Sequence, residues 1–154
     1  MANEIKELFG SPAALDIDLG GLASSTAGAG KQATIVDNTT TRFRLLLIHA
    51  SIKLGTSPTG NKAVTMYLVR SDGTRRSDGA GASKASLTVK NAQVIGVLST
   101  GTSPATGDVL QDWFVVENPG REWTVAIVHD SVAALDAPNG NHAIYWYGAN
   151  PEVQ

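Results

Sequence analysis

Three histidines are the residues of this sequence best suited to chemistry, because histidine binds metals and exchanges protons near neutral pH. They are His49, His129 and His142, and each lies in a stretch with the alternating apolar pattern of a β-strand. A metal site on such a scaffold needs several ligands at one point. The sequence contains no His-x-His pair with a carboxylate shortly after it. We therefore predict no metal ligand and no cofactor, and interpret these histidines as core or interface residues.

Nucleophilic catalysis and phosphate binding have equally little support. The chain has no cysteine and no GxSxG motif. The segment STAGAGKQ, 25–32, has the glycines of a phosphate loop, but Ser25 stands where the first glycine is needed and Gln32 follows the lysine. Asp16 and Asp18 share a face, yet nothing in the sequence gives the spacing that glycoside chemistry needs. We predict that no residue is catalytic and that the chain is not an enzyme.

The composition of the chain limits the classes of partner that it is expected to bind. The chain has 154 residues, enough for a single domain, with 42% hydrophobic residues and a formal net charge of −2. This charge gives no field that would attract nucleic acid or an anionic membrane. No apolar run is long enough to cross a bilayer, and MANEIKELFG lacks the order of a signal peptide. We therefore expect neither nucleic acid nor a membrane as a partner.

The elements that must position these residues are β-strands. The longest strand pattern is TRFRLLLIHASIKL at 41–54, in which neither face is polar after Leu45, as expected for a strand covered on both faces; AVTMYLVRS at 63–71 and EWTVAIVHD at 122–130 are two more predicted strands. Shorter patterns begin at 32, 85, 108 and 142, with Gly148 and Pro151 expected to end the last strand. Strands at regular spacing without crossover helices predict an antiparallel β-sandwich over 33–154, jelly-roll-like and with about eight strands.

Residues 1–32 differ from this body. They are rich in Gly, Ala and Ser, and alternate only weakly, which predicts an extended N-terminal arm that becomes ordered on contact. Residues 1–10 fit one short amphipathic turn. The apolar residues of the arm are the predicted contacts with a partner chain: Ile5, Leu8, Phe9, Leu15, Ile17 and Leu19.

Further contacts are expected from loops and from the aromatic residues of the last third. The loops GTSPTG, 55–60, and GTSPATG, 101–107, are alike, and we predict contacts at Pro58 and Pro104. The loop 71–86 carries the one tight basic pair, Arg75 and Arg76, which fits an anionic contact but has too few charges for nucleic acid. Adjacent aromatic residues on a strand point to opposite faces, so one face of the strand fills the core and the other needs a second layer to bury it. We predict that Tyr145 and Tyr147, on the face opposite Trp146, are contact residues. The side chains of the second face are then buried by a partner subunit, by a sugar ring, or by other parts of the chain's own core; these alternatives stay open.

Two stretches of the chain are similar to one known family. DGAGASKASLTVKNAQVIGVL at 78–98, the segment 122–154 and its closing NPEVQ resemble head decoration, or cement, proteins of tailed bacteriophages. The resemblance covers about 33–154 and implies a jelly-roll-like sandwich, commonly trimeric, on the outside of the virion. It also implies the major capsid protein and copies of the chain itself as partners. It carries over no catalytic residue.

Two other functions remain open at this point. The first is a carbohydrate-binding jelly roll of a phage tail or spike, motivated by the outward half of the aromatic residues. The second is a metal-dependent enzyme of the cupin type, which rests only on fold class and the three histidines.

Overall fold

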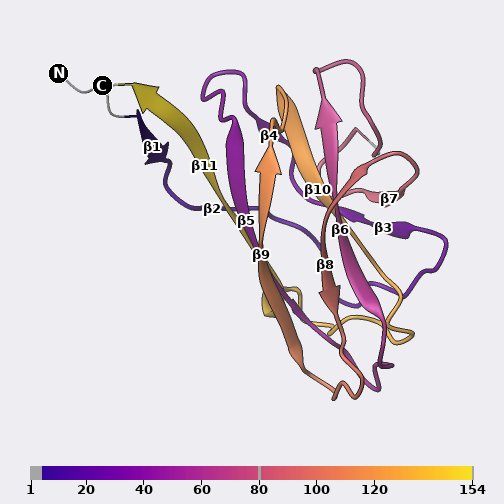
Figure 1. Cartoon of the computed structure of the whole chain (residues 1–154). Coiled ribbons are helices and arrows are strands. Elements are labelled where there is room, and N and C mark those ends of the chain that lie inside the picture. Colours follow the sequence, from indigo (N-terminus) through magenta and orange to yellow (C-terminus); the bar gives the residue numbers. More distant parts are fainter. Residues whose placement is uncertain (1–4, 80, 154) are drawn as a thin grey trace.

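The structure is a computed structural model that describes residues 5–79 and 81–153. Within these residues the chain forms two antiparallel β-sheets that pack face to face (Figure 1). The prediction of an all-β antiparallel sandwich is confirmed. Across the same residues, no helix has the length and apolar character needed to span a membrane.

The first sheet, sheet A, has five strands in the described part of the chain. β11 lies between β5 on one side and the short strands β1 and β2 on the other, and β9 pairs with the far edge of β5. The bounds are β1 Ile5–Phe9, β2 Ala13–Ala14, β5 Leu45–Lys53, β9 Val109–Glu117 and β11 Ala143–Val153.

The second sheet, sheet B, has six strands within the same limits. β10 lies between β6 and the short strands β3 and β4; β8 pairs with β6, and β7 pairs with β3. The bounds are β3 Ala29–Gln32, β4 Val36–Asp37, β6 Ala63–Ser71, β7 Ser86–Thr88, β8 Gln93–Ser99 and β10 Glu122–His129. A 3₁₀ turn, η1, covers Asn139–Asn141 before β11.

The order of pairing is that of a jelly roll. β1 and β2 follow one another along β11, and β3 and β4 follow one another along β10, so each pair acts as one interrupted strand. With β7 set aside, the chain then has eight strands in sequence order: β1 with β2, β3 with β4, β5, β6, β8, β9, β10 and β11. Sheet A contains strands 1, 8, 3 and 6 of this series, side by side in that order, and sheet B contains strands 2, 7, 4 and 5. This agrees with the jelly-roll prediction of about eight strands.

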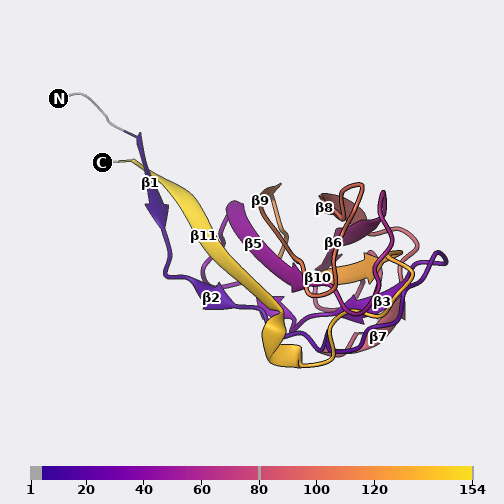
Figure 2. The same ribbon diagram turned by 90° about the horizontal axis from the view of Figure 1, so that it is seen from below.

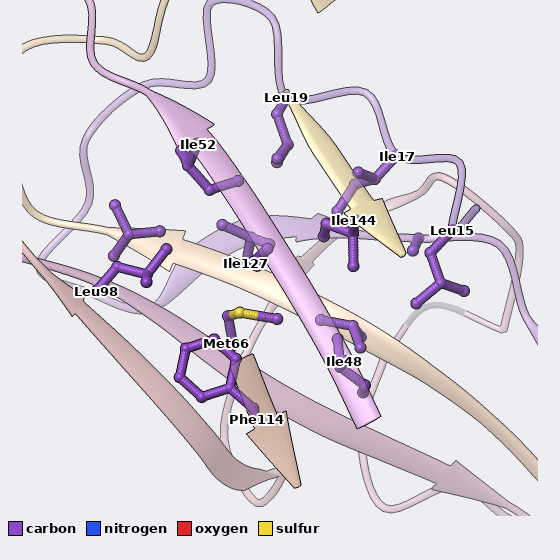
Figure 3. Close-up of a cluster of buried hydrophobic side chains, with 14 of the residues drawn as sticks. Leu15, Ile17, Leu19, Ile48, Ile52, Met66, Leu98, Phe114, Ile127 and Ile144 are labelled. Atoms are coloured by element: carbon purple, nitrogen blue, oxygen red, sulfur yellow. The ribbon is translucent and has the colours of Figure 1, made fainter. Parts of the chain in front are cut away.

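The core lies between the two sheets. β5 alternates strictly, with Leu46, Ile48, Ala50 and Ile52 fully buried and the residues between them half-buried. Opposing side chains such as Met66 of β6 and Ile127 of β10 come from sheet B and meet those of β5 (Figure 3). Burial of this continuous apolar layer is the main favourable term in folding.

The described part of segment 1–32 is built into both sheets. Its chain runs along β11 as β1 and β2 and then crosses to sheet B as β3 (Figure 2). Between these strands Leu15, Ile17 and Leu19 alternate with exposed residues and are buried in the core (Figure 3). The structure thus corrects their assignment as contacts with a partner chain. Their alternation is that of a core strand, and the small residues around them conceal it.

Both ends of the chain extend further as strand than the sequence suggested. Ile5–Phe9 is the strand β1 and not a helical turn, because it pairs residue by residue with Ala149–Val153 of β11. β11 also continues through Pro151. Pro151 is paired with Glu7 of β1 on one side, whereas the pairing of β11 with β5 on the other side ends at Ala149, so the missing N–H of Pro151 breaks no ladder to β5.

Candidate interaction surface

The outer face of sheet A carries an exposed aromatic and aliphatic surface, which we call the aromatic face. Trp113 is 53% exposed, Val115 60% and Tyr145 45%. Phe9 is exposed at the end of β1, and the remaining members are half-buried. The aromatic face consists of Phe9, Leu45, Leu47, His49, Trp113, Val115, Tyr145 and Tyr147.

Strand register sets these side chains in rows across the sheet. Tyr145 of β11 is opposite His49 of β5, which is opposite Trp113 of β9. The next row is Tyr147, Leu47 and Val115. Directly opposed residues of one face have Cβ atoms about 5 Å apart. The rings accordingly meet: the centroids of His49 and Trp113 are 4.8 Å apart, and those of Trp113 and Tyr147 are 5.7 Å apart.

The same alternation sends the neighbouring aromatics inward, as the sequence predicted. Trp146 packs against the core, with its ring centroid 5.0 Å from that of Trp123 and 5.9 Å from that of Phe43. Phe114 is buried beside the exposed Trp113. Tyr145 and Trp113 are thus the outward partners, and no described residue of the chain buries them.

The middle of the outer face of sheet B is covered by the chain itself, whereas Val94 and Val97 on its edge strand β8 are exposed. Val69, Leu87 and Ala126 form a second buried cluster, with Tyr67, Val89 and Ala92 packed against it. Residues 72–79 and 81–92, which include β7, contribute Leu87, Val89 and Ala92 to this cluster. We call these residues the covering loop.

Asp78 holds the covering loop in place. Its carboxylate accepts hydrogen bonds from the backbone N–H groups of Lys90, Asn91 and Ala92 at 2.5, 2.8 and 3.3 Å, and from that of Gly79 at 3.0 Å. Burial raises the pKa of Asp78, but these bonds outweigh it, so the pKa lies below its ordinary value. The repeated Ser-Asp-Gly of the sequence indicated turns, and no signal pointed to residues 90–92 as partners.

The structure brings the two similar proline loops together. The backbone N–H of Asn61 donates to the carbonyl of Gly101 at 2.5 Å, and that of Ser57 donates to Oγ1 of Thr106 at 3.1 Å. Pro58 and Pro104 are both half-exposed in these loops. They lie at one end of the sandwich and do not belong to the aromatic face.

The other predicted contacts are dispersed. Arg75 and Arg76 are exposed on the covering loop, beside sheet B. Ile5 and Leu8 lie on β1 opposite Val153 and Asn150 of β11; their side chains are outside the described part of the structure. Of the predicted contacts, Phe9, Tyr145 and Tyr147 are the three that share the aromatic face.

The histidines do not converge on one point. His49 belongs to the aromatic face, whereas His129 and His142 are buried. Nδ1 of His142 accepts from the backbone N–H of Lys53 at 3.3 Å, and Nε2 donates to the carbonyl of Asp136 at 2.9 Å. Among the described residues, no group of three His, Asp or Glu side chains could hold a metal ion.

His129 and Ser131 form a close pair that the sequence analysis missed. Nδ1 of His129 lies 2.9 Å from Oγ of Ser131, and Nε2 donates to the carbonyl of Leu22 at 2.8 Å. Burial lowers the pKa of His129, and the carbonyl and the charge of Asp130 offset only part of this effect. Both side chains are 1% exposed, so the hydroxyl does not face a surface that a substrate reaches. The pair ties segment 22–25 to the end of β10.

Comparison of this chain with protein-family models, curated proteins and solved structures finds no match.

Proposed function

We propose that this chain is a structural virion protein that binds the outside of a phage capsid and stabilises the shell as a decoration protein, with the major capsid protein and two further copies of itself as partners. The observation that carries the proposal is the aromatic face. Large exposed apolar surfaces on a folded domain mark sites of contact with other proteins. The resemblance of 78–98 and 122–154 to phage decoration proteins supplies the identity of the partner.

The geometry of the aromatic face suits a shell contact. It is a broad sheet surface whose two central rows come from β11, β5 and β9, and those strands are anchored in the core by their alternate residues. A pre-formed surface loses little conformational freedom on binding. Copies in a closed ring would each add one such contact, so that avidity strengthens attachment to a repeating lattice. Jelly rolls recur in viral capsids, although fold alone is weak support for function.

Binding to capsids that lack the protein tests the proposal. Purified chain is mixed with expanded heads, and cosedimentation and resistance of the heads to heat are measured. Val115→Ser removes an apolar group from the aromatic face, while Val97→Ser changes a valine of similar exposure, 51%, on β8 of sheet B. We expect binding by the original chain and by the Val97 variant, and at least tenfold weaker binding by a Val115→Ser, Trp113→Ala double variant. Absence of binding by the original chain rejects the proposal.

A carbohydrate-binding module of a tail or spike is the second candidate, and one observation favours it. Trp113 is more than half exposed and lies beside Tyr147, with the two rings tilted by 37°, and an exposed aromatic ring of this kind is a surface on which a sugar ring can stack. A glycan array separates the two functions. Binding to a glycan that is lost in Trp113→Ala, without binding to heads, supports the module; a blank array with intact head binding rejects it.

A further inference from the structure

Three arginines surround an open depression at one end of the sandwich. The loop 38–44, which precedes β5, meets the turn 118–121 between β9 and β10, at the end to which the arrow of β9 points (Figure 1). Between them is a depression of about 540 Å³ whose walls include Arg42, Arg44 and Arg121. All three arginines are exposed. The chain as a whole carries a formal net charge of −2, so three arginines around one depression are a local concentration of positive charge.

A buried asparagine fixes the backbone that carries these arginines. Asn38 is 5% exposed, and its Nδ2 donates to the carbonyls of Phe43 and Gly120 at 3.0 and 2.9 Å. Its Oδ1 accepts from the N–H of Phe43 at 2.8 Å, and its own N–H donates to the carbonyl of Arg121 at 2.7 Å. One side chain therefore ties both walls of the depression together.

The backbone is strained at the same place. Arg42 has φ of 52° and Asn118 has φ of 49°, in the left-handed region that few residues other than glycine adopt. Asn118 also donates its N–H to the carbonyl of Arg44 at 2.8 Å. Strain of this kind persists where surrounding bonds hold it, and it is concentrated at binding sites.

The charges of the depression are only partly balanced by the chain. Within the described residues, none of the three guanidinium groups forms an ion pair, and the one side-chain hydrogen bond is from Nε of Arg42 to the carbonyl of Thr39. Arg121 is near two carboxylates. Hydrogen bonds from Thr39 are the main cause of the lowered pKa of Asp37, and the charge of Arg121 adds to them. Arg121 also contributes to the lowered pKa of Asp72, after hydrogen bonds from Arg75 and Thr74.

We infer that this depression binds an acidic segment of another protein, with aspartate or glutamate carboxylates paired to the guanidinium groups of Arg42, Arg44 and Arg121. Guanidinium groups pair with carboxylates through two parallel hydrogen bonds, and groups held in place lose less freedom on pairing. Phe43, half-buried in the wall, gives an apolar contact for the methylene groups of a glutamate. Three arginines are too few for nucleic acid, whose affinity requires more phosphate contacts. The site goes beyond the proposed capsid contact through the aromatic face, and its test needs no capsid.

A labelled oligoglutamate peptide is the direct probe. Its binding to the purified chain is measured by fluorescence anisotropy at low salt and at physiological ionic strength. The test variant is Arg44→Gln, Arg121→Gln, because these two side chains form no hydrogen bond with described residues and their loss leaves the loop intact. The matched control is Arg75→Gln, Arg76→Gln, which removes the same charge from the covering loop. Thermal unfolding of both variants confirms that they fold.

We expect the peptide to bind, with Kd about fivefold weaker in the test variant, little changed in the control, and weaker for all three as salt is raised. Equal loss in both variants would mean that overall charge attracts the peptide, and this overturns the inference. So does tighter binding of a single-stranded oligonucleotide of equal charge, because the site would then select phosphate. Absence of peptide binding at low salt also rejects it, while leaving the capsid proposal untouched.

Discussion

The outer faces of the two sheets differ in how far their apolar side chains are buried. The middle of sheet B is covered by its own chain, because Val69 and Ala126 are buried in one cluster with Leu87 of the covering loop, and Asp78 holds that loop by four backbone hydrogen bonds; only the β8 edge, with Val94 and Val97, is exposed among its large apolar residues that the structure describes. Sheet A has no such cover among the described residues, and Trp113, Val115 and Tyr145 remain exposed. The chain thus buries apolar residues in the middle of the outer face of sheet B and leaves those in the middle of sheet A exposed. This contrast is the reason to assign the contact surface to sheet A.

The largest loss of stability is expected in the core between the two sheets, at Trp123 of β10, which is buried whereas Trp113 is exposed. Trp123 is 1% exposed and packs on Trp146, so Trp123→Ala should lower the free energy of unfolding by about 3–5 kcal/mol. Urea denaturation measures the loss. Trp123→Phe is the control and should cost much less, because the indole nitrogen of Trp123 has no hydrogen-bond partner among the described residues. A loss below about 1 kcal/mol for the alanine variant would contradict the assigned core.

The second largest loss of stability is expected at Asp78, which holds the covering loop on sheet B. Asp78→Ala removes the acceptor of four backbone N–H groups, and we expect a loss of about 2 kcal/mol together with faster hydrogen exchange in β7. Asp112→Ala is the matched control, because that carboxylate accepts a single bond, from the N–H of Trp113. Unchanged exchange in β7 would show that the covering loop is held by apolar contacts and not by Asp78.

Acidification should weaken the fold in two stages. Burial lowers the pKa of His129 below its ordinary 6.5, so the unfolded chain takes up more protons and stability falls as pH drops below about 6.5. The pKa of Asp78 is below its ordinary 3.8, so its contribution is complete above that value and is lost as pH falls further. Melting temperature against pH shows both stages. His129→Gln should remove the first and keep the second; persistence of the first in that variant would assign it to another group.

The smallest effect on stability is expected at the aromatic face. Trp113→Ala removes a side chain that is 53% exposed, so the free energy of unfolding should change by less than about 1 kcal/mol, against the much larger loss at Trp123. Both variants are measured under the same denaturant conditions. If Trp113→Ala is as costly as Trp123→Ala, the face is structural, and its exposure no longer argues for a partner.

The sequence predicted the sandwich because its main strands alternate. β5, β6 and β10 lie within the predicted strand ranges and β9 extends one residue past its predicted range of 108–116, since strand side chains point alternately to the two faces of a sheet. The same rule separated Tyr145 and Tyr147 from Trp146. It failed where alternation is short: Leu15, Ile17 and Leu19 are core residues within a stretch of small residues and glycines.

The features that the sequence analysis missed depend on contacts between segments that are far apart in the chain, and a single sequence does not reveal such contacts. β1 is a strand because Ala149–Val153 lies beside it, although the spacing of its apolar residues also fits a helical turn. The arginines of the depression are separated by up to 79 positions, and Asn38 joins their loops by hydrogen bonds to backbone carbonyls. Asp78 likewise binds N–H groups more than ten residues away. Contacts to backbone groups leave no mark in residue types.

The antiparallel pairing of β1 with the end of β11 sets Ile5 beside Val153, so a short peptide linker would close the chain into a ring without disturbing any sheet register (Figure 2). New ends opened at Gly73, in an exposed turn, would then give a circularly permuted protein. Because of the same adjacency, a partner joined ahead of Ile5 and one joined behind Val153 would be attached at neighbouring points on the edge of sheet A.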